Sequence, residues 1–276
     1  MRIEQGSPPD FHSFVADPSC EPHLDRSGRI CAYTFVHEGV SWLYLPGLAY
    51  FRLWPGNGYV EAFPEPEASA SIVVEAFYRI ALPMALQAAG YEVLHASAVS
   101  DTTRVHVFCG ASRSGKSTIA HALSNRGFRA WADDAVAFSA HDGQATAIPL
   151  PFALRLREDV ADFFGVHRPS GHTERKAEVL RGQEGRPLEI ASILLLERGP
   201  DSSVTRLSGH EALPGVLYHS FFVSLDQAVR RRMSTQFLDL VATVPVFRVS
   251  VGPALDTVAE LLDDLERRVL RPAERP

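Results

Sequence analysis

The sequence predicts a mixed α/β protein with a small β-rich region at its N-terminus, and three observations support this. Runs with alternating apolar side chains, such as Arg104–Cys109, are typical of strands. Segments with helical periodicity alternate with them from about residue 90 onward. The first 66 residues contain short aromatic and β-branched runs separated by turn residues. We therefore expect a β-rich region with a bridging helix over 1–90 and a larger α/β domain over 91–276.

Length and composition are those of a soluble globular protein. The 276 residues are 46% hydrophobic and 22% charged, which suffices to bury a full core. The net charge of −6 argues against broad binding of nucleic acid or anionic membranes, because both require a positive surface. We expect no membrane-spanning segment, because no apolar run approaches the roughly 20 residues that cross a bilayer, and no secretory signal, because the first residues lack an apolar stretch. We expect a cytoplasmic protein with no nucleic-acid or membrane partner, which could form a homo-oligomer.

The three cysteines, Cys20, Cys31 and Cys109, are an odd set without CxxC spacing. This pattern favours reduced thiols over a disulfide framework or a zinc site. We expect them to act as small buried hydrophobic residues.

The N-terminal region is expected to form a small antiparallel sheet from Ile30–Val36, Ser41–Leu45 and Tyr50–Trp54. Its aromatic side chains are interpreted as sheet core, and a peptide-binding surface is the alternative. The following segment, Ser69–Ala89, is mostly apolar and predicts a bridging helix that is interrupted or kinked near Pro83.

One eight-residue stretch matches the pattern GxxxxGK followed by Ser or Thr. Only two lysines occur in the chain, beside 25 arginines, so a lysine at this position is informative. The stretch follows the predicted strand Arg104–Cys109 and precedes a helical segment, as this motif requires. It consists of Gly110, Ala111, Ser112, Arg113, Ser114, Gly115, Lys116 and Ser117, and Thr118 follows.

In such a loop, successive backbone N–H groups surround the phosphates of a nucleotide. Lys116 can reach the terminal phosphates, and the Ser117 hydroxyl can hold Mg²⁺. The sequence therefore predicts a nucleotide-phosphate site with ATP and Mg²⁺ as ligands.

Two carboxylates follow the loop helix. Asp133 and Asp134 come after the predicted strand 127–132, where they could meet Mg²⁺ or the γ-phosphate, because ligands collect at the carboxyl ends of strands. A solvated acidic turn is the alternative. His95 lies within a predicted strand, Glu92–Val99, and is interpreted either as a core histidine or as a member of the site.

The middle of the chain is less regular. Glu158–Phe164 predicts a short helix, and 165–187 is interpreted as a polar loop whose Arg175 or Lys176 either reaches the nucleotide or is solvated. Leu188–Glu197 predicts a buried strand.

Two helices and a strand are expected to complete the fold. The helix Asp226–Ala242 carries Arg230, Arg231 and Arg232, which are interpreted as solvated, with one facing a phosphate as the alternative. A strand over 244–251 and a final helix over 255–269 follow, and the latter has a clear apolar stripe.

Three segments together, Leu94–Ser97, Gly110–Thr118 and Ala132–Asp134, resemble the catalytic domain of HPr kinase/phosphorylase and its shorter relatives. The resemblance implies a P-loop kinase core of the HPr kinase/PEP-carboxykinase type. It also implies that Asp134 accepts the proton of an acceptor serine hydroxyl, supported by Asp133, with His95 in the proton network.

In this resemblance, Lys116 is the catalytic lysine, and Ser117 and Asp133 are the metal ligands. Arg113 stands where the usual loop has glycine, and the glutamate-containing signature of the bifunctional enzymes is not recognisable. We therefore expect kinase activity without phosphorylase activity.

The shorter relatives include kinases that phosphorylate the C-terminal serine of lasso-peptide precursors. The resemblance therefore implies a peptide or small-protein acceptor. Two other hypotheses stay open, namely a non-catalytic nucleotide-binding sensor and a kinase of a small metabolite.

Overall fold

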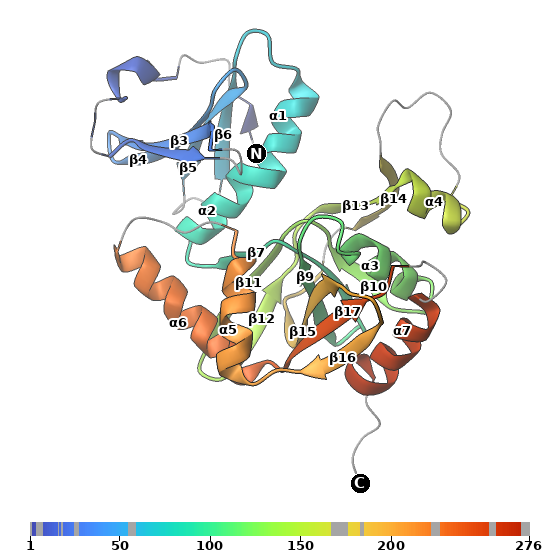
Figure 1. Cartoon of the computed structure of the whole chain (residues 1–276). Coiled ribbons are helices and arrows are strands. Elements are labelled where there is room, and N and C mark those ends of the chain that lie inside the picture. The colour runs from blue at the N-terminus through green and yellow to red at the C-terminus, as the bar shows by residue number, and fades with distance from the viewer. Residues whose placement is uncertain are drawn as a thin grey trace. The chain divides into compact units, whose positions relative to one another are not determined.

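The computed structural model describes residues 2–3, 8–15, 17, 19–24, 28–54, 59–166, 176–182, 185–221, 227–253 and 258–271. The chain divides into two compact units, Met1–Tyr91 and Glu92–Pro276. The first contains a six-stranded sheet and the second a nine-stranded sheet with helices on both faces (Figure 1). The predicted mixed α/β class is confirmed.

The sheet of the first unit has the strand order β1-β6-β5-β4-β3-β2. Its pairs are antiparallel except β1 with β6, so the predicted antiparallel sheet is confirmed. The strands are β1 (Arg2–Ile3), β2 (Glu21–Leu24), β3 (Ile30–His37), β4 (Val40–Leu45), β5 (Ala49–Trp54) and β6 (Tyr59–Pro64).

Aromatic side chains gather on one face of this sheet as a packed cluster. Phe11 lies with its ring centroid 4.6 Å from those of both Tyr33 and Tyr44, and the Tyr44 and Tyr50 rings stack at 4.2 Å. Phe11 lies between β1 and β2 in the chain and covers this face from a 3₁₀ turn, Phe11–Ser13. The aromatic residues therefore form core, as expected, because their ring faces contact one another.

The bridging helix packs on the other face of the same sheet. It comprises α1 (Ala70–Ala76), a π-helical turn (Phe77–Ala81) and α2 (Leu82–Ala88). The irregular turn directly precedes Pro83, which lacks the N–H group that an α-helix needs. Contrary to the sequence-based expectation, this helical stretch is long and apolar enough to cross a membrane by length and composition, a test that core helices also pass.

The nine-stranded sheet of the second unit follows the order β10-β8-β9-β15-β12-β11-β7, with β17 beside β15 and β16 beside β17. Three strands, β9, β15 and β17, are parallel neighbours. The bounds are β7 (Glu92–Leu94), β8 (Ala96–Ser100), β9 (Arg104–Gly110), β10 (Arg129–Ala132), β11 (Val136–His141), β12 (Gln144–Ile148), β15 (Leu188–Arg198), β16 (Ser203–Arg206) and β17 (Val246–Val251).

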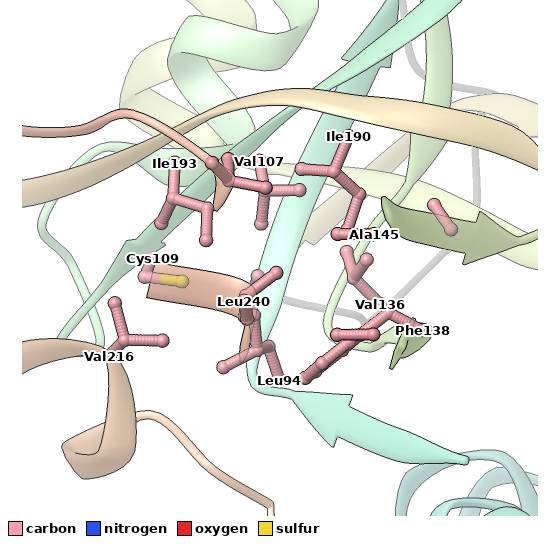
Figure 2. Packing of buried hydrophobic residues seen from close by; sticks show 14 of the residues in the cluster. Leu94, Val107, Cys109, Val136, Phe138, Ala145, Ile190, Ile193, Val216 and Leu240 are labelled. Atoms are coloured by element: carbon pink, nitrogen blue, oxygen red, sulfur yellow. The ribbon is translucent and has the colours of Figure 1, made fainter. Parts of the chain in front are cut away.

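Helices cover both faces of this sheet (Figure 1). The helices α3 (Lys116–Ser124) and α7 (Val258–Leu265), the latter followed by a π-helical turn (Glu266–Leu270), form one apolar layer. The helices α5 (Gly209–Tyr218) and α6 (Gln227–Thr243) form the other. In this second layer Val216 and Leu240 pack against strand residues such as Val107, Cys109 and Ile193 (Figure 2).

The expectation that residues 165–187 form a loop is wrong in part. Residues Lys176–Gly182 form a strand, β14, which pairs antiparallel with β13 (Phe152–Arg157) as a separate two-stranded sheet. The polar composition of β14 concealed it, because such a strand lacks the apolar alternation that marks a buried one. A short helix, α4 (Glu158–Phe163), follows β13 as predicted.

The expected single strand Glu92–Val99 is also wrong, because it is interrupted at His95. Before His95 the chain forms β7, which pairs with β11, and after it the chain forms β8, which pairs with β10 and β9. Likewise, Asp133 and Asp134 lie between β10 and β11. In the strand order, β10 and β8 lie at one end and β11 and β7 at the other. His95 connects β7 to β8, and Asp133 and Asp134 connect β10 to β11. The sheet therefore curls back on itself, and its two ends meet at His95 and Asp134.

The cysteines differ in their exposure. All three are free, but only Cys109 is buried, Cys20 is partly buried and Cys31 is exposed. Burial raises the pKa of the Cys109 thiol to about 12, so this thiol is neutral. The expectation of three buried residues is wrong for Cys31, which lies on β3 with its side chain in solvent.

Candidate functional site

The predicted phosphate-binding stretch joins a strand to a helix. Strand β9 ends at Gly110 and α3 begins at Lys116, with Gly115 as its N-cap at φ 108°. A Cβ atom on Gly110 would lie 2.3 Å from Ser114 Oγ and 2.8 Å from the Leu196 carbonyl oxygen. Only glycine therefore fits this close approach of backbone and side chain. Of the remaining loop residues, Ala111, Ser112 and Arg113 are exposed, and Ser117 and Thr118 are partly buried in the first turn of α3.

Lys116 folds back over the start of its own loop. Its Nζ donates hydrogen bonds to the carbonyl oxygens of Gly110, at 2.8 Å, and Ala111, at 3.3 Å. The side chain is only 8% exposed. The two carbonyl oxygens offset the cost of burying this ammonium group, and an amine at this place is suited to an anion bound at the loop.

Asp133 is the centre of the polar network beside the loop. Its Oδ1 accepts hydrogen bonds from Ser97 Oγ, at 2.6 Å, and Ser117 Oγ, at 2.9 Å, and its Oδ2 accepts one from the Arg155 backbone N–H at 3.3 Å. Burial raises the pKa of Asp133, as does the nearby charge of Asp134, while these three hydrogen bonds oppose the rise. The network thus joins β8, β10, α3 and β13 at one carboxylate.

Asp134 takes a left-handed backbone conformation at φ 66°, which turns the chain from β10 toward β11. Its carbonyl oxygen lies 3.0 Å from Nδ1 of His95. A carbonyl oxygen only accepts hydrogen bonds, so this contact places the imidazole proton on Nδ1. The structure therefore brings His95 to the aspartate pair.

His219, which follows α5, was not predicted from sequence. Its carbonyl oxygen accepts a hydrogen bond from the backbone N–H of His95 at 2.8 Å, and the backbones of Leu94 and Ser220 form an isolated antiparallel bridge. Burial lowers the pKa of His219 to about 4, with further lowering by the charges of Lys116 and His95. This histidine is therefore neutral at pH 7 and belongs to the polar surroundings of the lysine.

Ser97 and the Arg155 backbone N–H both donate to Asp133; Ser97 ends the segment Leu94–Ser97 but no role was predicted for it, and Arg155 was not singled out. Ser97 could have been found, because it lies two residues from His95 and hence on the same side of an extended chain. His219 and Arg155 gave no such signal, since neither lies in a recognisable motif.

Among the described residues, the other cations considered in the sequence analysis are not part of this network. Arg175 and the side chain of Lys176 lie outside the described residues. Arg230 and Arg231 are exposed on α6 and Arg232 is partly buried there, on a helix that packs over β11 and β12. These three arginines are thus placed on the helical layer opposite α3.

The donor set fits a nucleotide with Mg²⁺. Mg²⁺ is usually held by one or two protein oxygens together with substrate phosphates and water, and Ser117 and Asp133 present such oxygens. Within the described ranges, no group of three or more His, Cys, Asp or Glu side chains could hold a metal ion. The buried Ser114 hydroxyl has no hydrogen-bond partner among the described residues, and it lies close against Gly110.

Comparisons with known proteins find matches among solved structures. No protein-family model matches the sequence, and no curated protein does. Among solved structures, the chain is similar to the HPr(Ser) kinase/phosphatase from Coxiella burnetii, with 16% identity and a TM-score of 0.32. The alignment covers 62% of this chain and 88% of that chain. A likeness of this degree assigns no role to any residue here.

Proposed function

We propose that this protein is a P-loop kinase that transfers the γ-phosphoryl group of ATP to a serine hydroxyl of a peptide or small protein. The observation that carries the proposal is the contact of the Ser117 hydroxyl with Asp133, directly beside Asp134 and the buried Lys116. This contact combines a loop suited to phosphates with a carboxylate pair suited to a hydroxyl.

On the donor side, the loop 110–117 would bind the phosphates through its backbone N–H groups, as in other loops of this pattern. Lys116 would exchange its contacts with the Gly110 and Ala111 carbonyl oxygens for contacts with the terminal phosphates. Ser117 and Asp133 would hold Mg²⁺, which when bound neutralises charge on the phosphates.

On the acceptor side, the two aspartates have different surroundings. Asp133 already accepts three hydrogen bonds, which suits a fixed ligand. Asp134 would instead orient the acceptor hydroxyl and take its proton, because phosphoryl transfer requires mainly a well-positioned nucleophile. His95, which contacts the Asp134 carbonyl oxygen, holds this turn in place.

The acceptor class rests on the sequence resemblance of the three segments around His95, Gly110 and Asp134. Relatives of that kind phosphorylate serine in proteins or peptides. Within this class, the C-terminal serine of a lasso-peptide precursor is the acceptor that we put first.

The decisive experiment combines transfer and binding measurements. The purified protein with Mg·ATP should add one phosphate to a serine of its acceptor peptide, as detected by mass spectrometry. Asp134→Asn should abolish this transfer while ATP affinity stays within about threefold, because the carboxylate is needed for the hydroxyl and not for the nucleotide. Asn also tolerates the left-handed backbone at this position.

Asp142→Asn is the matched control. Asp142 also has a left-handed backbone, at φ 52°, but lies exposed in the turn between β11 and β12, so this variant should keep full activity. Undiminished transfer by Asp134→Asn would refute the base assignment. Transfer to a metabolite but to no peptide would favour a metabolite kinase, and nucleotide binding without transfer to any acceptor would favour a sensor.

A further inference from the structure

Arg198 lies beside the phosphate-binding loop although no motif marks it. It is the last residue of β15, the strand between β9 and β17. In the strand pairing Leu196 is opposite Gly110, and Arg198 is opposite Val251. The arginine therefore stands at the carboxyl ends of three parallel strands, which is where ligands collect in sheets of this kind.

The guanidinium group of Arg198 connects the loop to the neighbouring strand. Its Nε donates to the Arg113 carbonyl oxygen at 3.3 Å, and its Nη1 donates to the Gly252 carbonyl oxygen at 3.1 Å. Gly252 directly follows β17. Because a guanidinium is planar and rigid, two bonds from one group fix the distance between the loop and the end of β17.

The bond to Arg113 also fixes the direction of one peptide group in the loop. In a planar trans peptide the C=O and the N–H point in opposite directions, so the bond from Arg198 to the Arg113 carbonyl oxygen also fixes the direction of the Ser114 N–H. This N–H donates to the Ala111 carbonyl oxygen at 3.1 Å. Arg113 itself is held at φ 70°, a conformation that costs a non-glycine residue energy and needs external support.

We propose that Arg198 is a positioning residue for the nucleotide site, which holds the Arg113–Ser114 peptide and so keeps the turn from Ala111 to Ser114 in the shape that binds phosphates. The inference rests on the proposed nucleotide binding. It adds that Arg198 acts on the loop through a backbone carbonyl group.

Two measurements on the full chain test this role. Hydrogen exchange of the Ser114 amide in the ligand-free protein should accelerate about tenfold in Arg198→Ala, because the peptide loses its outer anchor. Titration with Mg·ATP and with inorganic triphosphate should show about tenfold weaker binding of both ligands. Arg198→Lys should give an exchange rate and affinities between those of the wild-type protein and those of Arg198→Ala. An ammonium group keeps the charge but lacks the rigid fork that reaches both carbonyl groups.

Arg231→Ala is the matched control, an exposed arginine on α6, and it should leave both measurements unchanged. A merely structural role would lower the thermal midpoint of Arg198→Ala without a selective change at the Ser114 amide. Unchanged exchange and unchanged affinities in Arg198→Ala would overturn the inference and leave the proposed function standing. If the wild-type protein binds neither ligand, the proposed nucleotide site fails, and the inference fails with it.

Discussion

The Ser117 hydroxyl donates a 2.9 Å hydrogen bond to Oδ1 of Asp133, and this contact joins the first turn of α3 to the end of β10. Ser97 donates to the same oxygen from β8. Two separate elements thus donate hydroxyl groups to one carboxylate. Hydrogen bonds from hydroxyl groups satisfy this carboxylate and hold Ser117 and Asp133, the proposed Mg²⁺ ligands, in position. Bound Mg²⁺ would replace these hydrogen bonds.

Replacing Asp133 by Asn should remove the magnesium dependence of nucleotide binding. The amide keeps the size of the side chain but lacks the charge that attracts Mg²⁺. We expect ATP affinity in the presence of Mg²⁺ to fall about tenfold or more and to equal the affinity in EDTA, as measured by calorimetry.

Ser97→Ala is the control for this change, because it removes a hydrogen bond to Asp133 and keeps the carboxylate. This variant should still bind ATP more tightly with Mg²⁺ than with EDTA. A magnesium effect of wild-type size in Asp133→Asn would contradict the assignment of Asp133 as a metal ligand.

Replacing Gly110 by Ala should destabilise the protein and disturb the loop. The added methyl group would lie 2.3 Å from Ser114 Oγ and 2.8 Å from the Leu196 carbonyl oxygen, and such overpacking typically costs about 1–3 kcal/mol. The double variant Gly110→Ala/Ser114→Ala should recover part of this loss in urea unfolding, because it removes one of the two clashes. Equal stability of the single and double variants would show that the Leu196 contact alone sets the cost.

Sequence analysis located the loop, the aspartate pair and His95 because these residues lie in short segments with local signals. Glycine and lysine spacing identifies a loop without any knowledge of the fold. The apolar residues that identify β9 and β15 likewise follow from the burial of these strands in the sheet. For such features, the local sequence contains the information that determines the structure.

Other features could not be predicted, since they depend on which strands become neighbours. His95 interrupts a strand because β7 pairs with β11 while β8 pairs with β9, and no residue near His95 signals this change of partner. Similarly, His219 approaches His95 from a helix more than a hundred residues later in the chain. Contacts of this kind come from topology, and the residues involved have no distinctive spacing.

Replacing Arg113 by Gly should not lower the free energy of unfolding of the protein. Arg113 has φ 70°, which costs a non-glycine residue about 1 kcal/mol, while glycine adopts it freely but loses more entropy on folding. The free energy of unfolding should therefore stay the same or rise by up to about 1 kcal/mol in urea titration. The carbonyl group that Arg198 contacts is retained, so ATP affinity should also be kept.

Arg113→Val provides the opposite test at the same position. A β-branched side chain tolerates the left-handed region poorly, so we expect a loss of about 1–2 kcal/mol. If valine and glycine have equal effects, the loop does not hold position 113 in this conformation.

The stability of the second unit should decrease as the pH falls from about 6.5 to about 4, and His106 should be one cause. This histidine is 1% exposed, its Nδ1 contacts Ser192 Oγ at 2.9 Å, and its Nε2 lies 3.9 Å from Oδ2 of Asp101. Burial lowers its pKa from 6.5 to about 4, although the charge of Asp101 opposes this. The neutral form is therefore the one that the fold accommodates.

The sign follows from proton uptake. Below pH 6.5 the unfolded chain binds a proton at His106, whereas the folded protein binds it only near pH 4, so acidification favours unfolding across this interval. The total loss from this group is about 3 kcal/mol. His106→Asn retains a polar partner for Ser192 but does not titrate, so urea unfolding at pH 7.0 and 4.5 should show a smaller decrease for the variant. An identical decrease in both proteins would exclude His106 as a source of the acid sensitivity and assign it to other groups, such as His219.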